Sequence, residues 1–210
     1  LEHSPGGSSS GSGAAVADHQ VALALGTQPG GAVLRPASYN GAYGLKPTIG
    51  LIPRAGVLLQ SHTLDTVGVY GRCVADLALL TDALSQPEPE DVMSFAGTRP
   101  RLTESLTVPL DRPPRLAFLE TPAWAEADEG ARHALEDYLQ ALDKPAERIT
   151  LADPFGDILA LHGAVFSAEN AYYYGPHFRE RPELMSDKLK ARMSAAMDFP
   201  AVDYVHALRM

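Results

Sequence analysis

Two glycine-rich segments hold the residues whose types could do chemistry. Residues 5–13 read Pro-Gly-Gly-Ser-Ser-Ser-Gly-Ser-Gly, and residues 26–31 read Gly-Thr-Gln-Pro-Gly-Gly. A glycine–serine run is typical of a flexible linker or a phosphate loop, and a serine hydroxyl becomes a nucleophile only when a base removes its proton. A Walker phosphate loop needs a lysine followed by Ser or Thr after its glycines, which this run lacks, so that interpretation is excluded.

The elements around the first run argue against a linker. Small residues at 14–17 predict the start of a helix, with Ser12 as its expected cap. Val21–Leu25 reads as a buried strand that ends at Gly26-Thr27, and a second glycine turn follows at 30–31. The run therefore belongs to a packed domain.

Beyond residue 47 the sequence alternates between helical and extended patterns. Apolar residues recur along one stripe at 73–84, where Cys73 is expected to be a small core residue. Six prolines make 86–114 an irregular connection. The further elements that the pattern predicts are strands at 115–119 and 148–151 and helices at 131–142, 155–174, 183–197 and 201–210. Strands separated by helices predict an α/β layered domain.

Composition narrows the class of partner. The 210 residues include 17 basic and 26 acidic ones, and a net charge of −9 disfavours a nucleic-acid surface. No apolar run is long enough to span a bilayer. The single cysteine excludes an intrachain disulfide and favours a reducing, cytoplasmic location. The seven histidines show no metal-ligand spacing, so we expect no metal site.

Longer motifs carry a resemblance to a known family. Gly6–Ala17 and Leu25–Ser38 resemble the amidase signature family in their order, their spacing and the strand between them. Further segments that agree with this family are Gly44–Pro47, Ile52–Gly56 and His62–Gly68. The resemblance implies an α/β/α sandwich around a mixed β-sheet, incomplete at both ends, which we expect to be cut. We expect one domain over 1–210: a signature core at 1–85, the proline-rich connection at 86–114, and an α/β continuation at 115–210.

The resemblance also implies a reaction. Members of this family are serine hydrolases that cut the C–N bond of carboxylic amides, without a metal or organic cofactor. A lysine acts as base through a second, bridging serine that follows a cis peptide bond. Transferred to this sequence, the bridging serine is Ser8, and the nucleophile position, 24 residues further on, is Ala32.

Neighbouring residues take the roles that the family gives to binding the substrate. Backbone N–H groups near Pro29, Gly30 and Gly31 would stabilise the oxyanion. The hydroxyl of Thr27 would steady that turn, or Thr27 is an ordinary residue at the end of a strand. Arg35 would clamp a substrate carboxylate, or it is a structural arginine that pairs with the backbone. We leave both pairs of alternatives open.

Three departures from the family pattern predict an inactive chain. Ala32 has a methyl group where the family has the attacking oxygen, Pro29 has no N–H to donate, and none of the seven residues before Ser8 is lysine. Lys46 belongs to a segment that we interpret as structural. Loss of a triad member leaves only roughly 10³–10⁴-fold catalysis over water, so we expect no measurable amidase turnover. The alanine is engineered, or it marks a natural degenerate homologue, or it lies in a fragment or an imperfectly read sequence.

Other functions remain open. The chain could be a non-catalytic homologue that binds small amides or carboxylates, with no nucleic-acid or membrane partner and with a homodimer left open. It could also be the A-type subunit of an amidotransferase. Gln28 stands where many relatives, including that subunit, have aspartate, and with the acidic charge it weighs against the subunit. We expect Asp65 to hold a loop by hydrogen bonds, and Tyr172–Tyr174 to pack on a helix or line a substrate funnel.

Overall fold

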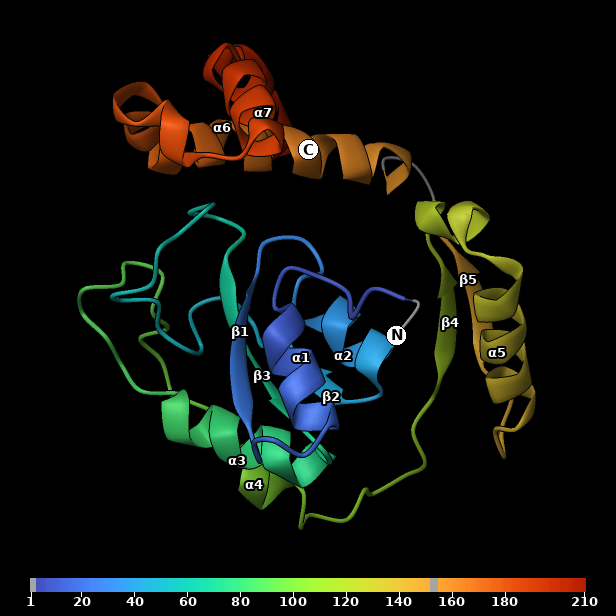
Figure 1. Cartoon of the computed structure of the whole chain (residues 1–210). Helices are drawn as coiled ribbons and strands as arrows, with labels where there is room; N and C mark the ends of the chain where they lie inside the picture. Colours follow the sequence, from blue (N-terminus) through green and yellow to red (C-terminus); the bar gives the residue numbers. More distant parts are fainter. Residues whose placement is uncertain (1–2, 152–154) are drawn as a thin grey trace. The chain divides into compact units, whose positions relative to one another are not determined.

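The structure is a computed structural model that describes residues 3–151 and 155–210, and the chain divides into two compact units (Figure 1). Unit 1 takes the residues up to 108 together with 166–199. Unit 2 takes 109–165 and 200–210. Both glycine-rich segments belong to unit 1, and the single domain expected from the sequence stays a prediction.

A three-stranded antiparallel sheet forms the centre of unit 1. Its strand order is β1 (Ala24–Gln28), β3 (Thr66–Gly71) and β2 (Tyr43–Leu45). Gln28 pairs with Thr66, so the end of β1 lies beside the start of β3. The second glycine turn therefore leaves the sheet at this point.

Helices cover both faces of this sheet. Alternate residues of a strand point to opposite faces. Val67 and Val69 of β3 pack in a core cluster with Ile52 and with Leu77 of α3 (Val74–Leu84). Tyr70 points the other way, into a second cluster, whose other buried members are Val16 of α1 (Ser10–Ala17), Val33, and Ala37 of α2 (Leu34–Asn40). Figure 1 shows α1 and α2 side by side, and the layering is the expected α/β/α arrangement.

A buried polar network holds the loop between β2 and β3. Arg54 is 3% exposed and donates to the carbonyl oxygens of His62, at 2.8 Å, and Asp65, at 3.0 Å. The Asp65 carboxylate accepts the N–H groups of residues 60 and 61, so the expected loop-holding role of Asp65 is confirmed. Glu169, also buried, accepts hydrogen bonds from Ser61 and Thr63.

The remaining helices of unit 1 come from three segments of the chain. They are α4 (Leu102–Ser105), residues 166–180 of α6 (Ile158–Glu180), and the two elements η3 (Pro182–Leu184) and α7 (Asp187–Met197). Ser186 caps α7 by accepting a hydrogen bond from the N–H of Leu189, at 3.3 Å. This is the N-cap arrangement in which a serine oxygen satisfies a free helical donor.

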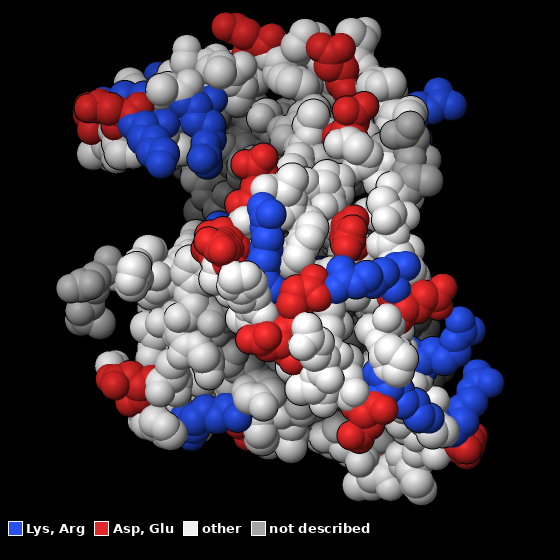
Figure 2. Space-filling view, turned by 90° about the vertical axis from the view of Figure 1, so that its right-hand side faces the viewer, with Lys and Arg blue, Asp and Glu red and all other residues white. Residues whose placement is uncertain are grey.

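Unit 2 is built around a parallel strand pair, β4 (Ala117–Glu120) and β5 (Glu147–Thr150). Its other elements are η1 (Pro122–Glu126), α5 (Glu129–Gln140), η2 (Phe155–Asp157), the start of α6, and α8 (Ala201–Arg209). Among the residues of unit 2 that the structure describes, those of β4, β5 and α5 include no buried residue. Arg148 pairs with Glu120 and Glu136, and Figure 2 shows acidic and basic side chains interspersed on one face of the molecule.

Most expected elements are present, with shifted ends. α3 lies within the stripe predicted at 73–84, and α5, α6, α7 and α8 overlap the other predicted helices. Of the strands, β1 begins at Ala24, three residues later than expected. None of the helices in the described ranges has the length and apolar character that crossing a bilayer requires.

Two expectations about local structure were wrong, and two elements were not predicted. Cys73 is exposed, because it is the extended cap residue before α3 and its backbone is not part of the helix. Ser12 does not cap α1, since it lies within the helix and donates to the carbonyl oxygen of Leu25, at 2.6 Å. No local pattern indicated α2, because a proline such as Pro36 normally predicts the end of a helix. Pro36 lies in the first turn of α2, where a residue needs no N–H for the helical hydrogen bonds. β3 was missed because it is buried on both faces, so its sequence lacks the alternation of apolar and polar residues that indicates a strand.

Candidate functional site

The two glycine turns meet at a backbone hydrogen bond. The N–H of Ser9 donates to the carbonyl oxygen of Ala32, at 3.3 Å. The preceding peptide bond, between Gly7 and Ser8, is cis. Ser8 is exposed, whereas Ala32 is buried and only 7% exposed. The residue that the resemblance assigns as bridging serine is therefore one position from a direct contact with the residue at the nucleophile position.

Ser9, which sequence reasoning did not single out, joins the first turn to β1. Its hydroxyl oxygen accepts the N–H of Thr27, at 3.3 Å, and lies 3.5 Å from the carbonyl oxygen of the same residue. Thr27 thus contributes to this contact through its backbone. The adjacent Ser10 donates to the carbonyl oxygen of Gly6, at 2.6 Å, and closes the turn. A run of three serines carried no signal that would separate their roles.

Arg35 connects the two turns from the first helical turn of α2. Its guanidinium donates to the carbonyl oxygens of Gly7, at 3.3 Å, and Gly30, at 3.2 Å. These are the backbone contacts that one of the two interpretations of Arg35 expected. Gly31 adopts φ +85°, and a methyl group there would lie 2.9 Å from the guanidinium. The turn therefore needs glycine at 31 for its conformation and for the passage of Arg35.

Gln28 supports the start of α2. It is buried, and its side-chain oxygen accepts the N–H groups of Val33, at 2.8 Å, and Leu34, at 3.0 Å. The first N–H groups of a helix have no partner within the helix, and a side-chain oxygen can satisfy them. An aspartate carboxylate can supply the same kind of acceptor. The replacement of aspartate by Gln28 therefore does not distinguish an amidotransferase subunit from a small-amide hydrolase.

Tyr70 reaches the same point from β3. Its side chain is fully buried, and its hydroxyl donates to the carbonyl oxygen of Ala32, at 3.3 Å. Burial raises the pKa of Tyr70 because it disfavours the phenolate, and a hydrogen bond with the Ser9 side chain lowers it in part. Tyr70 therefore keeps its proton and acts as a donor. Sequence reasoning missed this residue because it lies 38 positions from its partner.

Other polar residues considered from the sequence lie in separate arrangements. Lys46 donates to the carbonyl oxygen of the adjacent Pro47, at 2.7 Å. The hydroxyl of Tyr173 lies 3.3 Å from Nδ1 of His62. Within 3–151 and 155–210, the structure brings together no three His, Cys, Asp or Glu side chains that could hold a metal ion.

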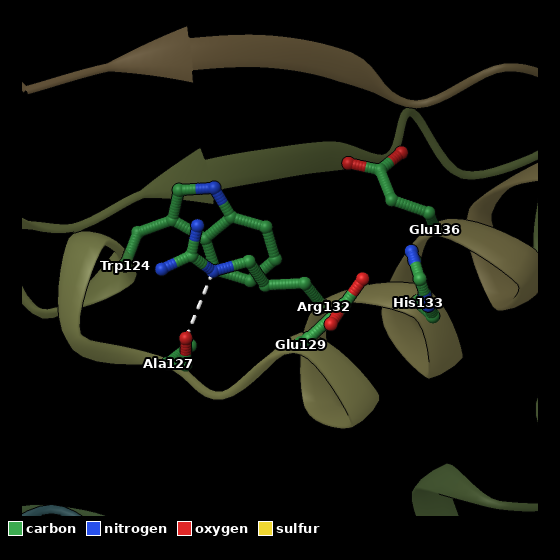
Figure 3. A pocket seen from close by; sticks show the side chains of 6 residues that line it. All are labelled: Trp124, Ala127, Glu129, Arg132, His133 and Glu136. Carbon is green, nitrogen blue, oxygen red and sulfur yellow. Dashed lines mark hydrogen bonds between the residues drawn. The ribbon is translucent and has the colours of Figure 1, made fainter.

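A pocket of about 570 Å³ lies in unit 2, on one side of α5 (Figure 3). The residues that line it are Trp124, Ala127, Glu129, Arg132, His133 and Glu136. Arg132 donates to the carbonyl oxygen of Ala127, at 2.9 Å, and Glu136 pairs with Arg148, so two of its charged groups already have partners. None of the site residues expected from the sequence lines this pocket.

Comparison with known proteins identifies relatives of this arrangement. The family model described as Amidase matches residues 1–155. Among curated proteins, the chain is 44% identical over 136 residues to the A-type subunit of glutamyl-tRNA(Gln) amidotransferase from Thermus thermophilus, covering 65% of this chain and 28% of that protein. The corresponding protein from Clostridium novyi is 41% identical over 151 residues, which are 72% of this chain and 31% of the Clostridium protein. The chain thus spans about three-tenths of these relatives.

Solved structures show the same fold. One of them is a chain from a complex described as a vestigial protein complex that reveals the evolutionary origins of an s-triazine catabolic enzyme. It is 30% identical, with a TM-score of 0.88 over 98% of this chain and 44% of that one. The native peptide amidase from Stenotrophomonas maltophilia is 26% identical, with a TM-score of 0.68 over 98% of this chain and 47% of that one.

Proposed function

Since this chain belongs to the amidase family, we propose that its ancestral reaction is hydrolysis of a carboxylic amide and that the chain itself binds an amide or carboxylate without turnover. The observation that carries the proposal is the hydrogen bond from the N–H of Ser9 to the carbonyl oxygen of Ala32, at 3.3 Å. It brings the cis-linked turn of Ser8 against position 32. A family member would need this proximity for a proton to pass from the nucleophile to the bridging serine.

The missing chemistry follows from the side chains. In an active family member, the residue at position 32 attacks the amide carbonyl, and the bridging serine relays its proton. The Ala32 methyl group forms no acyl intermediate. The turn still has the N–H groups of Gly30 and Gly31 to offer to a carbonyl oxygen, while Pro29 has none. The site therefore retains binding groups and lacks a nucleophile.

Arg35 supports a preference for ligands that carry a carboxylate. A guanidinium has five N–H donors, and backbone contacts to Gly7 and Gly30 leave others for a ligand. Arg35 is exposed, so a ligand at the surface of the turns can reach it. A planar guanidinium can bind a carboxylate through two parallel hydrogen bonds. The proposed ligand class is a small amide with a second, anionic end.

Calorimetric titration with succinamate, and with butyramide as the neutral counterpart, tests the binding. We expect succinamate to bind at least about tenfold tighter than butyramide, because a hydrogen bond to a charged group contributes about 1.5–3 kcal/mol. In Arg35→Lys this preference should fall, because lysine lacks the planar fork. Equal affinity of the wild type for both compounds would show that Arg35 does not bind the carboxylate. No binding of either compound would refute the proposed function.

Activity tests the assignment of position 32. We expect no release of ammonia from either amide by the wild type. Ala32→Ser should release no ammonia either, because none of the seven residues before Ser8 is the lysine that would act as base. Hydrolysis by the wild type at an ordinary enzymatic rate would contradict the placement of the nucleophile at Ala32.

We also propose, as a second candidate, that the protein is the A-type subunit of an amidotransferase. The named relatives at 44% and 41% identity favour it, and Gln28 no longer argues against it. The acidic composition of the chain remains the opposing observation. Co-purification with partner subunits from the source cells would favour this function. Light scattering of the purified chain tests the homodimer, and the cytoplasmic location stays a prediction.

A further inference from the structure

We infer that Tyr70 and Gln28 form a clamp on the peptide unit between Ala32 and Val33, and that this clamp sets the direction of the side chain at position 32. Neither residue touches a reacting atom, so both are positioning residues. The inference rests on the proposed function only where it concerns ligand binding. Its structural part stands on the contacts of these residues alone.

One half of the clamp holds the carbonyl oxygen. The oxygen of Ala32 accepts from the N–H of Ser9 and from the hydroxyl of Tyr70, each at 3.3 Å. A carbonyl oxygen has two lone pairs, so the two donors do not compete. Because the raised pKa of Tyr70 keeps its hydroxyl protonated, this donor persists across the neutral pH range.

The other half holds the amide nitrogen of the same peptide unit. The N–H of Val33 donates to the side-chain oxygen of Gln28, at 2.8 Å. A peptide unit is planar, with its C=O and N–H pointing in opposite directions. Partners at both ends therefore fix the rotation of the plane, which is the ψ angle of Ala32. Position 32 lies in a turn, where this angle would otherwise be free to vary.

Both clamp side chains come from the sheet and are buried. Gln28 is the last residue of β1, and Tyr70 lies in β3, paired with Ala24. The ring of Tyr70 fits because Gly26 has no side chain, and a methyl group there would lie 2.9 Å from the ring. A site carried by strands is positioned more precisely than one carried by a loop. The sheet therefore positions the two side chains that hold the turn.

Amide hydrogen exchange, followed by NMR, tests the clamp without any ligand. We expect Tyr70→Phe to speed exchange of the Val33 amide by about two- to tenfold, the factor for losing one buried hydrogen bond. Gln28→Leu should have a larger effect, and Gln28→Glu, which keeps an acceptor oxygen, should restore much of the protection. The amide of Val69 reports global opening. Its exchange in Tyr70→Phe should change less than that of Val33.

Tyr173→Phe is the matched control, because it removes a tyrosine hydroxyl that contacts His62 elsewhere in unit 1. It should leave Val33 exchange unchanged. The clamp is refuted if Tyr70→Phe leaves Val33 exchange unchanged, or if Val33 and Val69 change by the same factor. Titration with succinamate should show a loss of affinity of about two- to tenfold in Tyr70→Phe. If the wild type binds no succinamate, the proposed function fails while the exchange data still decide the clamp.

Discussion

The consecutive residues Ser8, Ser9 and Ser10 show how little residue type alone decides. Ser8 is exposed after a cis bond, the Ser9 hydroxyl accepts the N–H of Thr27, and the Ser10 hydroxyl closes the turn onto the carbonyl oxygen of Gly6. Each hydroxyl has the same chemistry, and the backbone around it selects what it contacts. The space for these contacts is created by glycines, of which Gly26 is closely confined by Ser9 and Tyr70.

Gly26→Ala should destabilise the protein through overpacking. A methyl group there would lie 2.7 Å from the Ser9 hydroxyl oxygen and 2.9 Å from the Tyr70 ring. Extra atoms in a packed core cost about 1–3 kcal/mol, so we expect a loss of that size in urea unfolding. Gly11→Ala is the matched control, because a methyl group in that part of α1 meets no atom within 4 Å. It should be neutral or stabilise the protein, and equal losses in both variants would contradict the packing argument.

At the scale of elements, the loop between β2 and β3 depends on a buried ion pair. The guanidinium of Arg54 lies 3.2 Å from the carboxylate of Asp91, and both side chains are almost fully buried. Removing one partner of a buried pair leaves an uncompensated charge, which costs about 3–5 kcal/mol. We expect Arg54→Leu to lower the unfolding free energy at pH 7 by that amount. Glu104→Gln, which breaks the exposed pair of Arg101 and Glu104, should cost less than about 1 kcal/mol.

The same pair predicts a pH dependence. Burial raises the pKa of Asp91, but hydrogen bonds from the Arg54 side chain and from two backbone N–H groups outweigh it and hold the pKa below 3.8. A lowered folded-state pKa contributes stability that is present above 3.8 and lost as pH falls through the folded value. The difference in unfolding free energy between the wild type and Arg54→Leu, measured in urea, should therefore narrow below that pH. An unchanged gap would show that Asp91 does not couple to Arg54.

At the scale of the whole molecule, the two units differ in how much they bury. Every residue of β3 is buried, whereas within the described part of unit 2 the strands β4 and β5 have no buried residue. Parallel strands are normally covered on both faces, so this pair lacks the burial that usually stabilises it. Stability within one chain follows such differences in local packing. Unit 2 is therefore expected to be the less stable part.

Hydrogen exchange with mass spectrometry tests this difference. Amides in Ala117–Glu120 and Glu147–Thr150 should exchange at least about tenfold faster than those in Thr66–Gly71, because fewer buried contacts oppose their opening. Peptides from α3, whose stripe is partly buried, provide an intermediate reference. Equal protection of the two sheets would show that unit 2 is stabilised by more than its exposed surfaces indicate.

Several features followed from the sequence because their signals are local. The glycine–serine run, the second glycine turn and their spacing led to the amidase family, and the apolar stripe led to α3. The placement of the nucleophile position at Ala32 also came from a residue count, and it stays a prediction. α2 and β3 were missed, because a proline in a first helical turn resembles a stop, and a strand buried on both faces has no alternation.

Motifs and periodicity along the chain were enough to establish the family, the layered α/β class and the candidate positions Ser8 and Ala32. How position 32 is held became visible in the folded molecule. Tyr70, Ser9 and Gln28 meet at the peptide unit after Ala32 because antiparallel pairing of β1 with β3 and the turn after β1 bring them together. Contacts between residues far apart along the chain leave no periodicity or motif, so only the folded backbone reveals them.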